Sequence, residues 1–142
     1  MLFARNKGHY TSLVFVDLCK AFDCVQHQKL INELFSLGVR DTALTWFTNY
    51  LSSWSQRLRI AQRFGDVSPC SRGVPQGSVL GPLLFRLYIR SLQEAIADVK
   101  CQLFADDILI YCSADNSYFI CIAEELSKSL TAMHKWLQEP VQ

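Results

Sequence analysis

The chain has 142 residues, of which 50% are hydrophobic and 12% aromatic, so it can bury the core of one domain and is not an intrinsically disordered protein. Its formal net charge of +1 neither requires nor excludes a nucleic-acid partner. No stretch is long and apolar enough for a membrane span or a signal peptide, and the six cysteines form no C-x-x-C pair. We therefore expect an intracellular protein, in the nucleus or the cytoplasm and not secreted, without membrane contact; support for zinc binding is weak.

A buried strand is predicted at residues 13–16, where four apolar residues lead to Asp17 at the carboxyl end. Residues 18–23 are too short and too mixed in character for a second strand, so a turn should follow. Apolar residues at helical spacing then predict a helix over residues 28–35, which Gly38 ends. A second helix should begin at Asp41 and form an antiparallel pair with the first.

Residues 56–61 alternate between apolar and polar or cationic side chains, which predicts a strand with one exposed face. Between residues 54 and 72 there is a single acid, Asp66, against four arginines. Such a stretch is either a solvated strand face or a surface that contacts phosphates, and charge alone does not decide between them. The candidate nucleic-acid-binding residues are Arg57, Arg59, Arg63 and Arg72.

Two glycines and a proline over residues 73–78 predict a specific loop whose backbone approaches another group closely. Residues 80–96 keep helical spacing and predict one long core helix, with Pro82 tolerated in its first turn. Two apolar runs, 99–104 and 108–111, then predict a β-hairpin. A last helix should run from about residue 115 to Pro140.

This order of elements predicts an α+β fold, with helices packed on one face of a small antiparallel sheet. In that arrangement Asp17 can lie beside the hairpin tip, where Asp106 and Asp107 are adjacent. Neighbouring carboxylates repel each other unless a cation lies between them, and oxygen ligands without sulfur or imidazole select Mg2+ or Mn2+. Two such ions can activate a hydroxyl and stabilise a leaving pyrophosphate, which favours phosphoryl transfer. An exposed turn is the alternative, and the apolar flanks argue against it.

Three segments, 15–23, 73–82 and 104–107, resemble the three palm motifs of reverse transcriptases, most closely those of non-LTR (LINE-type) retrotransposons, in the same order and at similar spacing. The resemblance extends from about Thr11 to about Leu137. It implies a polymerase palm-like fold and a single partial reverse transcriptase domain over residues 1–142. That domain would hold the palm and part of the fingers–palm connection, and lack the thumb and most of the fingers.

The resemblance also implies roles for individual residues. Asp17, Asp106 and Asp107 match the catalytic, metal-binding aspartates, and the backbone carbonyl of Leu18 is a further candidate ligand. Phe22 matches the bulky residue beneath the incoming sugar, which favours deoxynucleotides. Gln76 and Gly77 match the loop that contacts the nascent base pair and the template. The cofactor would be Mg2+ or Mn2+, and the partners an RNA template, a DNA primer and a deoxynucleoside triphosphate.

Two functions remain open from the sequence. The first is an RNA-directed DNA polymerase palm domain that transfers nucleotides to a primer 3′-hydroxyl by a two-metal mechanism, with little processive activity expected of the isolated chain. The second is a non-catalytic retroelement-derived domain that binds RNA or a protein partner. Metal binding separates them, because only the first requires it. The oligomeric state is not indicated by the sequence.

Overall fold

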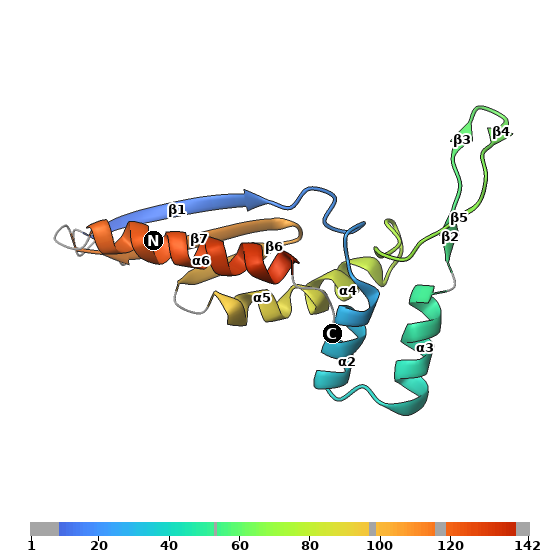
Figure 1. The fold of residues 1–142 in the computed structure, drawn as a ribbon, viewed down its shortest axis with the longest axis horizontal. Coiled ribbons are helices and arrows are strands. Elements are labelled where there is room, and N and C mark those ends of the chain that lie inside the picture. Colours follow the sequence, from blue (N-terminus) through green and yellow to red (C-terminus); the bar gives the residue numbers. More distant parts are fainter. Residues whose placement is uncertain (1–8, 53, 97–98, 116–118, 139–142) are drawn as a thin grey trace. The chain divides into compact units, whose positions relative to one another are not determined.

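The computed structural model describes residues 9–52, 54–96, 99–115 and 119–138 (Figure 1). Within these ranges the chain forms two compact units, one from residues 9–19 and 89–138 and the other from residues 20–88. The first unit, called unit 1 below, holds a sheet and two helices, and the second, unit 2, holds three helices and a hairpin. The predicted α+β class is confirmed.

Unit 1 is built on a three-stranded antiparallel sheet in the order β1 (Tyr10–Asp17), β7 (Asp107–Ala114), β6 (Lys100–Phe104). The β-branched and aromatic residues of these segments favour strands. β1 pairs with β7 over its whole length, from Tyr10 opposite Ala114 to Asp17 opposite Asp107 (Figure 1). The predicted strand and the predicted hairpin are therefore both present, and the strand begins earlier than expected.

One face of this sheet is covered by helices. α6 (Phe119–Gln138) packs against β7 and β1, and α5 (Arg90–Ala95) packs against α6. Ile108 and Ile110 point to this side and are buried. On the other face Phe15 and Phe104 are 78% and 80% exposed. The predicted one-sided covering of the sheet is thus confirmed within unit 1.

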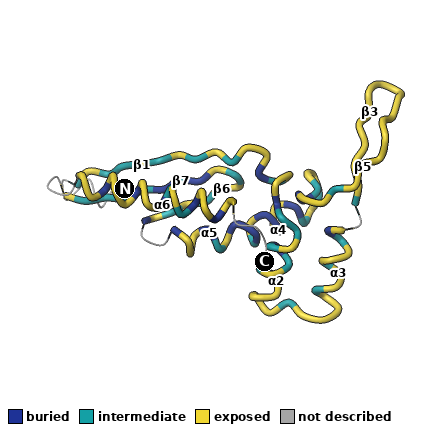
Figure 2. Tube along the Cα trace, in the orientation of Figure 1, coloured by how far each residue is buried: buried dark blue, intermediate teal, exposed yellow. Residues whose placement is uncertain are grey.

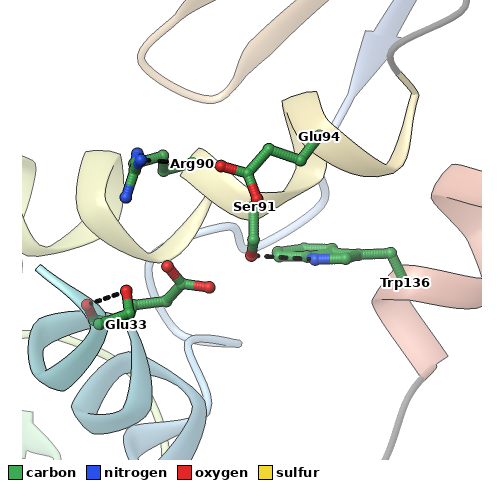
Figure 3. Close-up of polar contacts among 6 residues, drawn as sticks. Glu33, Arg90, Ser91, Glu94 and Trp136 are labelled. Atoms are coloured by element: carbon green, nitrogen blue, oxygen red, sulfur yellow. Dashed lines mark hydrogen bonds and ion pairs between the residues drawn. The ribbon is translucent and has the colours of Figure 1, made fainter.

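A partly buried hydrogen bond helps to fix α5 on α6. The indole Nε1–H of Trp136 donates to the Ser91 hydroxyl oxygen at 3.2 Å (Figure 3). Arg90 and Glu94 form an ion pair at 3.7 Å along the exposed side of α5, also drawn in Figure 3. Because both side chains of that pair are solvated, its contribution to stability is small.

Unit 2 contains α2 (His27–Ser36), α3 (Asp41–Ser52) and α4 (Gly81–Tyr88). α2 packs against both other helices, and Leu30 and Leu34 on α2 are fully buried. Gly38 has a φ of +93°, a left-handed conformation that ends α2 as predicted. The predicted pair of helices is present, and α4 completes their core.

A long hairpin leaves the helices of unit 2 (Figure 1). It consists of two short strand pairs, β2 (Ser55–Gln56) with β5 (Ser68–Pro69) and β3 (Arg59–Ile60) with β4 (Arg63–Phe64). The prediction of one half-buried strand over residues 56–61 is wrong. The segment is interrupted, and both Leu58 and Ile60 are 67% exposed, because among the described residues these strands pair only with each other and no other element covers them.

The prediction of one long helix over residues 80–96 is also wrong. α4 ends at Tyr88 and α5 begins at Arg90, with Ile89 between them at φ −81° and ψ −5°. The Leu92 N–H donates to the Ile89 carbonyl at 3.1 Å, a tighter i to i+3 contact than an α-helix makes. Leu83, one of the apolar residues of the predicted core helix, is 50% exposed. None of the described helices is both long and apolar enough to cross a bilayer.

Candidate functional site

Two of the three candidate aspartates lie directly opposite each other on adjacent strands of the sheet. Asp17 ends β1, Asp107 begins β7, and they are direct partners in the antiparallel register. Both are exposed, on the face opposite buried Ile108. Directly opposed residues have Cβ atoms about 4.5–5.5 Å apart, a distance at which like charges destabilise the pairing. A cation beside this pair would offset that repulsion.

The third aspartate lies in the turn next to this pair. Ala105 and Asp106 form the two-residue turn between β6 and β7, and Asp106 is half-buried. Ala105 has a φ of +53°, an unfavourable conformation for a residue with a Cβ atom. The turn therefore holds Asp106 at the same end of the sheet as Asp17 and Asp107. The predicted convergence of strand end and hairpin tip is present, and the roles of the three residues remain predictions.

The carboxylate oxygens of the candidate aspartates suit a hard cation, but they do not form a complete coordination shell. Among the described residues, no group of three or more His, Cys, Asp or Glu side chains is arranged to hold a metal ion. Asp17 and Asp107 supply neighbouring carboxylate oxygens, which Mg2+ and Mn2+ prefer, and Mg2+ retains several waters or substrate oxygens in such sites. The carboxylate oxygens thus match the ligand preference of such an ion, but they do not complete its coordination by themselves. Leu18, the candidate backbone ligand, directly follows Asp17 and is half-buried.

In unit 2, backbone hydrogen bonds join the segment around Phe22 to the loop that begins at Gly73. The Val74 N–H donates to the Phe22 carbonyl at 2.9 Å, and the Gly73 N–H donates to the Val25 carbonyl at 2.8 Å. His27 Nε2 lies 2.7 Å from the Gly73 carbonyl oxygen, so the first residue of α2 also holds this loop. Two of the segments that resemble palm motifs are therefore joined directly.

Gly73 permits this close approach. Its φ is +88°, and a Cβ atom added there would lie 3.0 Å from the Cα and the carbonyl oxygen of Asp23. Gly77 also has a positive φ, of +81°, but a Cβ atom there would meet nothing within 4 Å. Gly73 is thus required because the backbone at Asp23 lies so close, whereas Gly77 leaves open space beside the loop.

This loop and Phe22 line a pocket of about 330 Å³. The Phe22 ring stacks on Phe85 with centroids 4.7 Å apart and an interplanar angle of 27°, which holds the ring in one orientation. The volume lies within the range of small-molecule sites. The pocket brings together all three candidate nucleotide-contacting residues, and its lining consists of Phe22, Pro75, Gln76, Gly77 and Pro82.

The four candidate arginines do not form one cluster. Arg57 and Arg59 lie on one side of the hairpin with Phe64, whereas Arg63, the partner of Ile60, alternates to the other side. Arg72 lies outside the hairpin, where it forms an isolated bridge with Gln26. Of the four candidates, Arg57 and Arg59 therefore lie together on one side of the hairpin, and Arg63 and Arg72 lie elsewhere.

Sequence reasoning missed two residues that organise these surfaces. His27 contacts the Gly73 carbonyl, and nothing in the sequence connects these two residues. Phe64 contacts Arg57 and Arg59, and its place near alternating arginines is the sequence pattern that could indicate such a cation–π contact.

Comparisons with known proteins bear on the whole chain. A family model described as reverse transcriptase (RNA-dependent DNA polymerase) matches residues 2–140. The probable RNA-directed DNA polymerase from transposon X-element of Drosophila melanogaster is 33% identical over 118 residues, 78% of this chain. The probable RNA-directed DNA polymerase from transposon BS of the same species is 30% identical over 151 residues, 96% of this chain. The RNA-directed DNA polymerase from mobile element jockey of Drosophila funebris is 30% identical over 146 residues, 94% of this chain.

The chain spans only between 12% and 16% of the length of these three relatives. The matches confirm the family resemblance predicted from segments 15–23, 73–82 and 104–107.

Proposed function

The chain belongs to the reverse transcriptase (RNA-dependent DNA polymerase) family, and on that premise we propose that it is the palm part of an RNA-directed DNA polymerase. In this proposal it extends the 3′-hydroxyl of a DNA primer along an RNA template. The observation that carries the proposal is the placement of Asp17 opposite Asp107, with Asp106 in the adjoining turn. An otherwise unfavourable pair of opposed carboxylates is well explained by cation binding.

The proposed reaction is nucleotidyl transfer. The primer 3′-oxygen forms a bond to the α-phosphorus of a deoxynucleoside triphosphate, the bond from that phosphorus to the leaving pyrophosphate breaks, and the hydroxyl proton passes to water. A divalent cation, Mg2+ or Mn2+, would favour loss of the proton and neutralise charge on the leaving group. Asp17, Asp106 and Asp107 would hold it, with the Leu18 carbonyl as a further ligand.

Phe22, Gln76 and Gly77 are proposed to contact the nucleotide. The stacking of Phe22 on Phe85 supports a steric role, because a ring held in one orientation can exclude a 2′-hydroxyl. Gly77, with open space where a Cβ atom would lie, allows the backbone to approach a base pair. These assignments place a deoxynucleotide against the lining of the 330 Å³ pocket.

We propose that the chain represents a partial domain, with the palm and part of the fingers–palm connection. The relatives are polymerases much longer than this chain. Thumb and fingers segments would hold the duplex and the triphosphate, so the isolated chain should add nucleotides slowly and with little processivity. The alternative is a non-catalytic domain that binds RNA or a protein partner.

The test is single-nucleotide addition to a DNA primer on an RNA template in Mn2+, paired with Mn2+ titration followed by electron paramagnetic resonance. The wild-type chain is compared with Asp17→Asn and with Asp115→Asn, which removes an exposed carboxylate at the far end of β7. We expect Asp17→Asn alone to lose both nucleotide addition and Mn2+ binding. Equal addition by all three chains would contradict the catalytic assignment. Absence of Mn2+ binding in the wild type, with RNA binding intact, would establish the alternative.

A further inference from the structure

The hairpin of residues 55–69, called the hairpin arm below, lacks a core. All of its residues are exposed, and Figure 2 draws this part of the tube, at β3 and β5, in yellow. The exposed set includes the apolar side chains of Leu58, Ile60 and Val67. A two-stranded hairpin without a third strand or a covering helix is only marginally stable in water. Such an element would gain stability from contact with a partner.

The charge of the hairpin arm favours an anionic partner. It contains three arginines and one acid, Asp66, a net charge of +2 within a chain whose net charge is +1. Arg59 and Phe64 are direct cross-strand partners, so their side chains lie on the same side. The guanidinium carbons of Arg57 and Arg59 lie 4.0 Å and 5.5 Å from the centroid of the Phe64 ring. One side of the hairpin arm therefore presents two cations around one ring.

Both guanidinium groups are oriented before any ligand binds. Arg59 Nε–H donates to the Ala61 carbonyl at 3.1 Å, which ties this side chain to the turn of its own hairpin and leaves its other N–H donors available. Stacking on Phe64 restrains Arg57 in the same way. Because less side-chain entropy is lost on binding, such groups form stronger contacts than freely rotating lysines or arginines.

We propose that the hairpin arm binds the phosphate backbone of a nucleic acid through Arg57 and Arg59. Planar guanidinium groups bind phosphate oxygens with two parallel hydrogen bonds, and two arginines on alternate positions of one strand can contact neighbouring phosphates. Phe64 contacts both guanidinium groups, so its role in this proposal is to orient the arginines toward phosphates. The contact is consequently independent of nucleotide sequence and strongly dependent on salt. The choice of nucleic acid as the partner rests on the proposed function, but the contact requires neither metal nor catalysis.

The experiment measures binding of labelled single-stranded RNA and of an RNA–DNA duplex, both of mixed sequence, by fluorescence anisotropy at several salt concentrations. The wild-type chain is compared with the double variant Arg57→Gln/Arg59→Gln. The matched control is Arg86→Gln/Arg90→Gln, which removes the same charge from exposed positions on α4 and α5. Circular dichroism and thermal unfolding establish that each variant is folded.

We expect the hairpin variant to bind about tenfold more weakly or worse at low salt, since two charge-assisted contacts are lost. Its slope of log K against log salt should decrease in magnitude by about 1.4 for the single strand or about 1.8 for the duplex. The control variant should bind nearly as the wild type does. Phe64→Leu should weaken binding to an intermediate extent, because both arginines keep their charge but Arg57 loses the ring contact that restrains it.

Equal losses in the hairpin and control variants would overturn the proposal, since net charge alone would then explain binding. Failure of the wild-type chain to bind either nucleic acid would overturn it as well, and would favour a protein partner for the apolar side of the hairpin arm. The binding assay contains a chelator and no nucleotide, so it needs neither a divalent cation nor the carboxylates that would hold it. The test of the hairpin arm therefore fails or succeeds independently of the catalytic proposal.

Discussion

Asp17 and Asp107 are cross-strand partners at one end of the antiparallel pair formed by β1 and β7. In the absence of a cation, their mutual repulsion opposes the pairing on which the sheet of unit 1 depends. Asp107→Asn should therefore stabilise the metal-free chain, by a few tenths of a kcal/mol to about 1 kcal/mol at low ionic strength, because both groups are exposed. The free energy of unfolding in urea, measured in the presence of a chelator, gives this difference.

The same measurement in millimolar Mn2+ should reverse the order. The wild-type chain should gain stability from the ion, whereas Asp107→Asn should gain less. Asp115→Asn is the control, since it removes an exposed carboxylate outside the opposed pair. Destabilisation of the metal-free chain by Asp107→Asn would show that the carboxylate takes part in a favourable contact and would contradict the repulsion argument.

Substitutions at Gly73 and Gly38 separate two effects on stability: that of a left-handed backbone conformation, and that of steric contact between an added Cβ atom and its neighbours. Both have a strongly positive φ, +88° and +93°, but only Gly73 has neighbours where a Cβ atom would lie. Gly38→Ala should lower the free energy of unfolding by about 1 kcal/mol, the backbone effect alone. Gly73→Ala should lower it by at least twice as much, because the backbone at Asp23 has to move.

Denaturation curves of the two glycine variants provide the comparison. The displaced segment carries Phe22, so Gly73→Ala should also change the NMR signals of the Phe22–Phe85 ring pair. Equal destabilisation by the two substitutions would mean that the loop moves at no measurable cost in free energy. The close approach to Asp23 would then not restrict the residue type at position 73.

The thiol of Cys112 on β7 is held near a carboxylate on α6. Its Sγ lies 3.2 Å from Glu125 Oε2, and partial burial, followed by the hydrogen bond and the charge of Glu125, raises the pKa of this thiol. Because the thiolate is the reactive form, alkylation of Cys112 near pH 8.5 should be slow in the wild type and faster in Glu125→Gln. Peptide mass spectrometry after timed iodoacetamide treatment resolves Cys112 from the other cysteines.

Glu124→Gln serves as the control for that experiment, since Glu124 is the exposed neighbour and the hydrogen bond comes from Glu125. A group whose pKa is higher in the folded than in the unfolded chain stabilises the fold below its unfolded pKa, and this contribution is lost as the pH rises through the folded value. Stability from Cys112 should thus be complete at neutral pH and decline in alkali. An unchanged alkylation rate in Glu125→Gln would contradict the assigned cause.

Several parts of the candidate site were predictable from local sequence. An apolar run that ends in Asp17, and two apolar runs around Asp106 and Asp107, are strands whose ends can meet, and the register of β1 with β7 fulfils that expectation. The helix stop at Gly38 follows from the ease with which glycine adopts a positive φ. In each case the residue pattern itself contains the physical cause.

Other parts depend on contacts that the residue pattern does not contain. Helical spacing continues from residue 80 to residue 96 without a glycine or a proline that would mark the end of α4, yet the helix stops at Tyr88. Leu58 and Ile60 alternate with arginines as in a half-buried strand, but nothing among the described residues covers them. Periodicity shows which residues share a face, whereas burial depends on what lies opposite.

The register of β1 also determines when unit 1 can fold. The hydroxyl oxygens of Thr11 and Ser113 lie 2.9 Å apart although 102 positions separate them in the sequence. Pairings of such high contact order form slowly, while the helices of unit 2 make contacts closer in sequence. During synthesis β1 therefore leaves the ribosome long before β7 exists, with its backbone unpaired and Leu13 and Phe15 open to other strands. Asp17 is thus translated first among the three aspartates, yet its position is fixed only after the last strand has emerged.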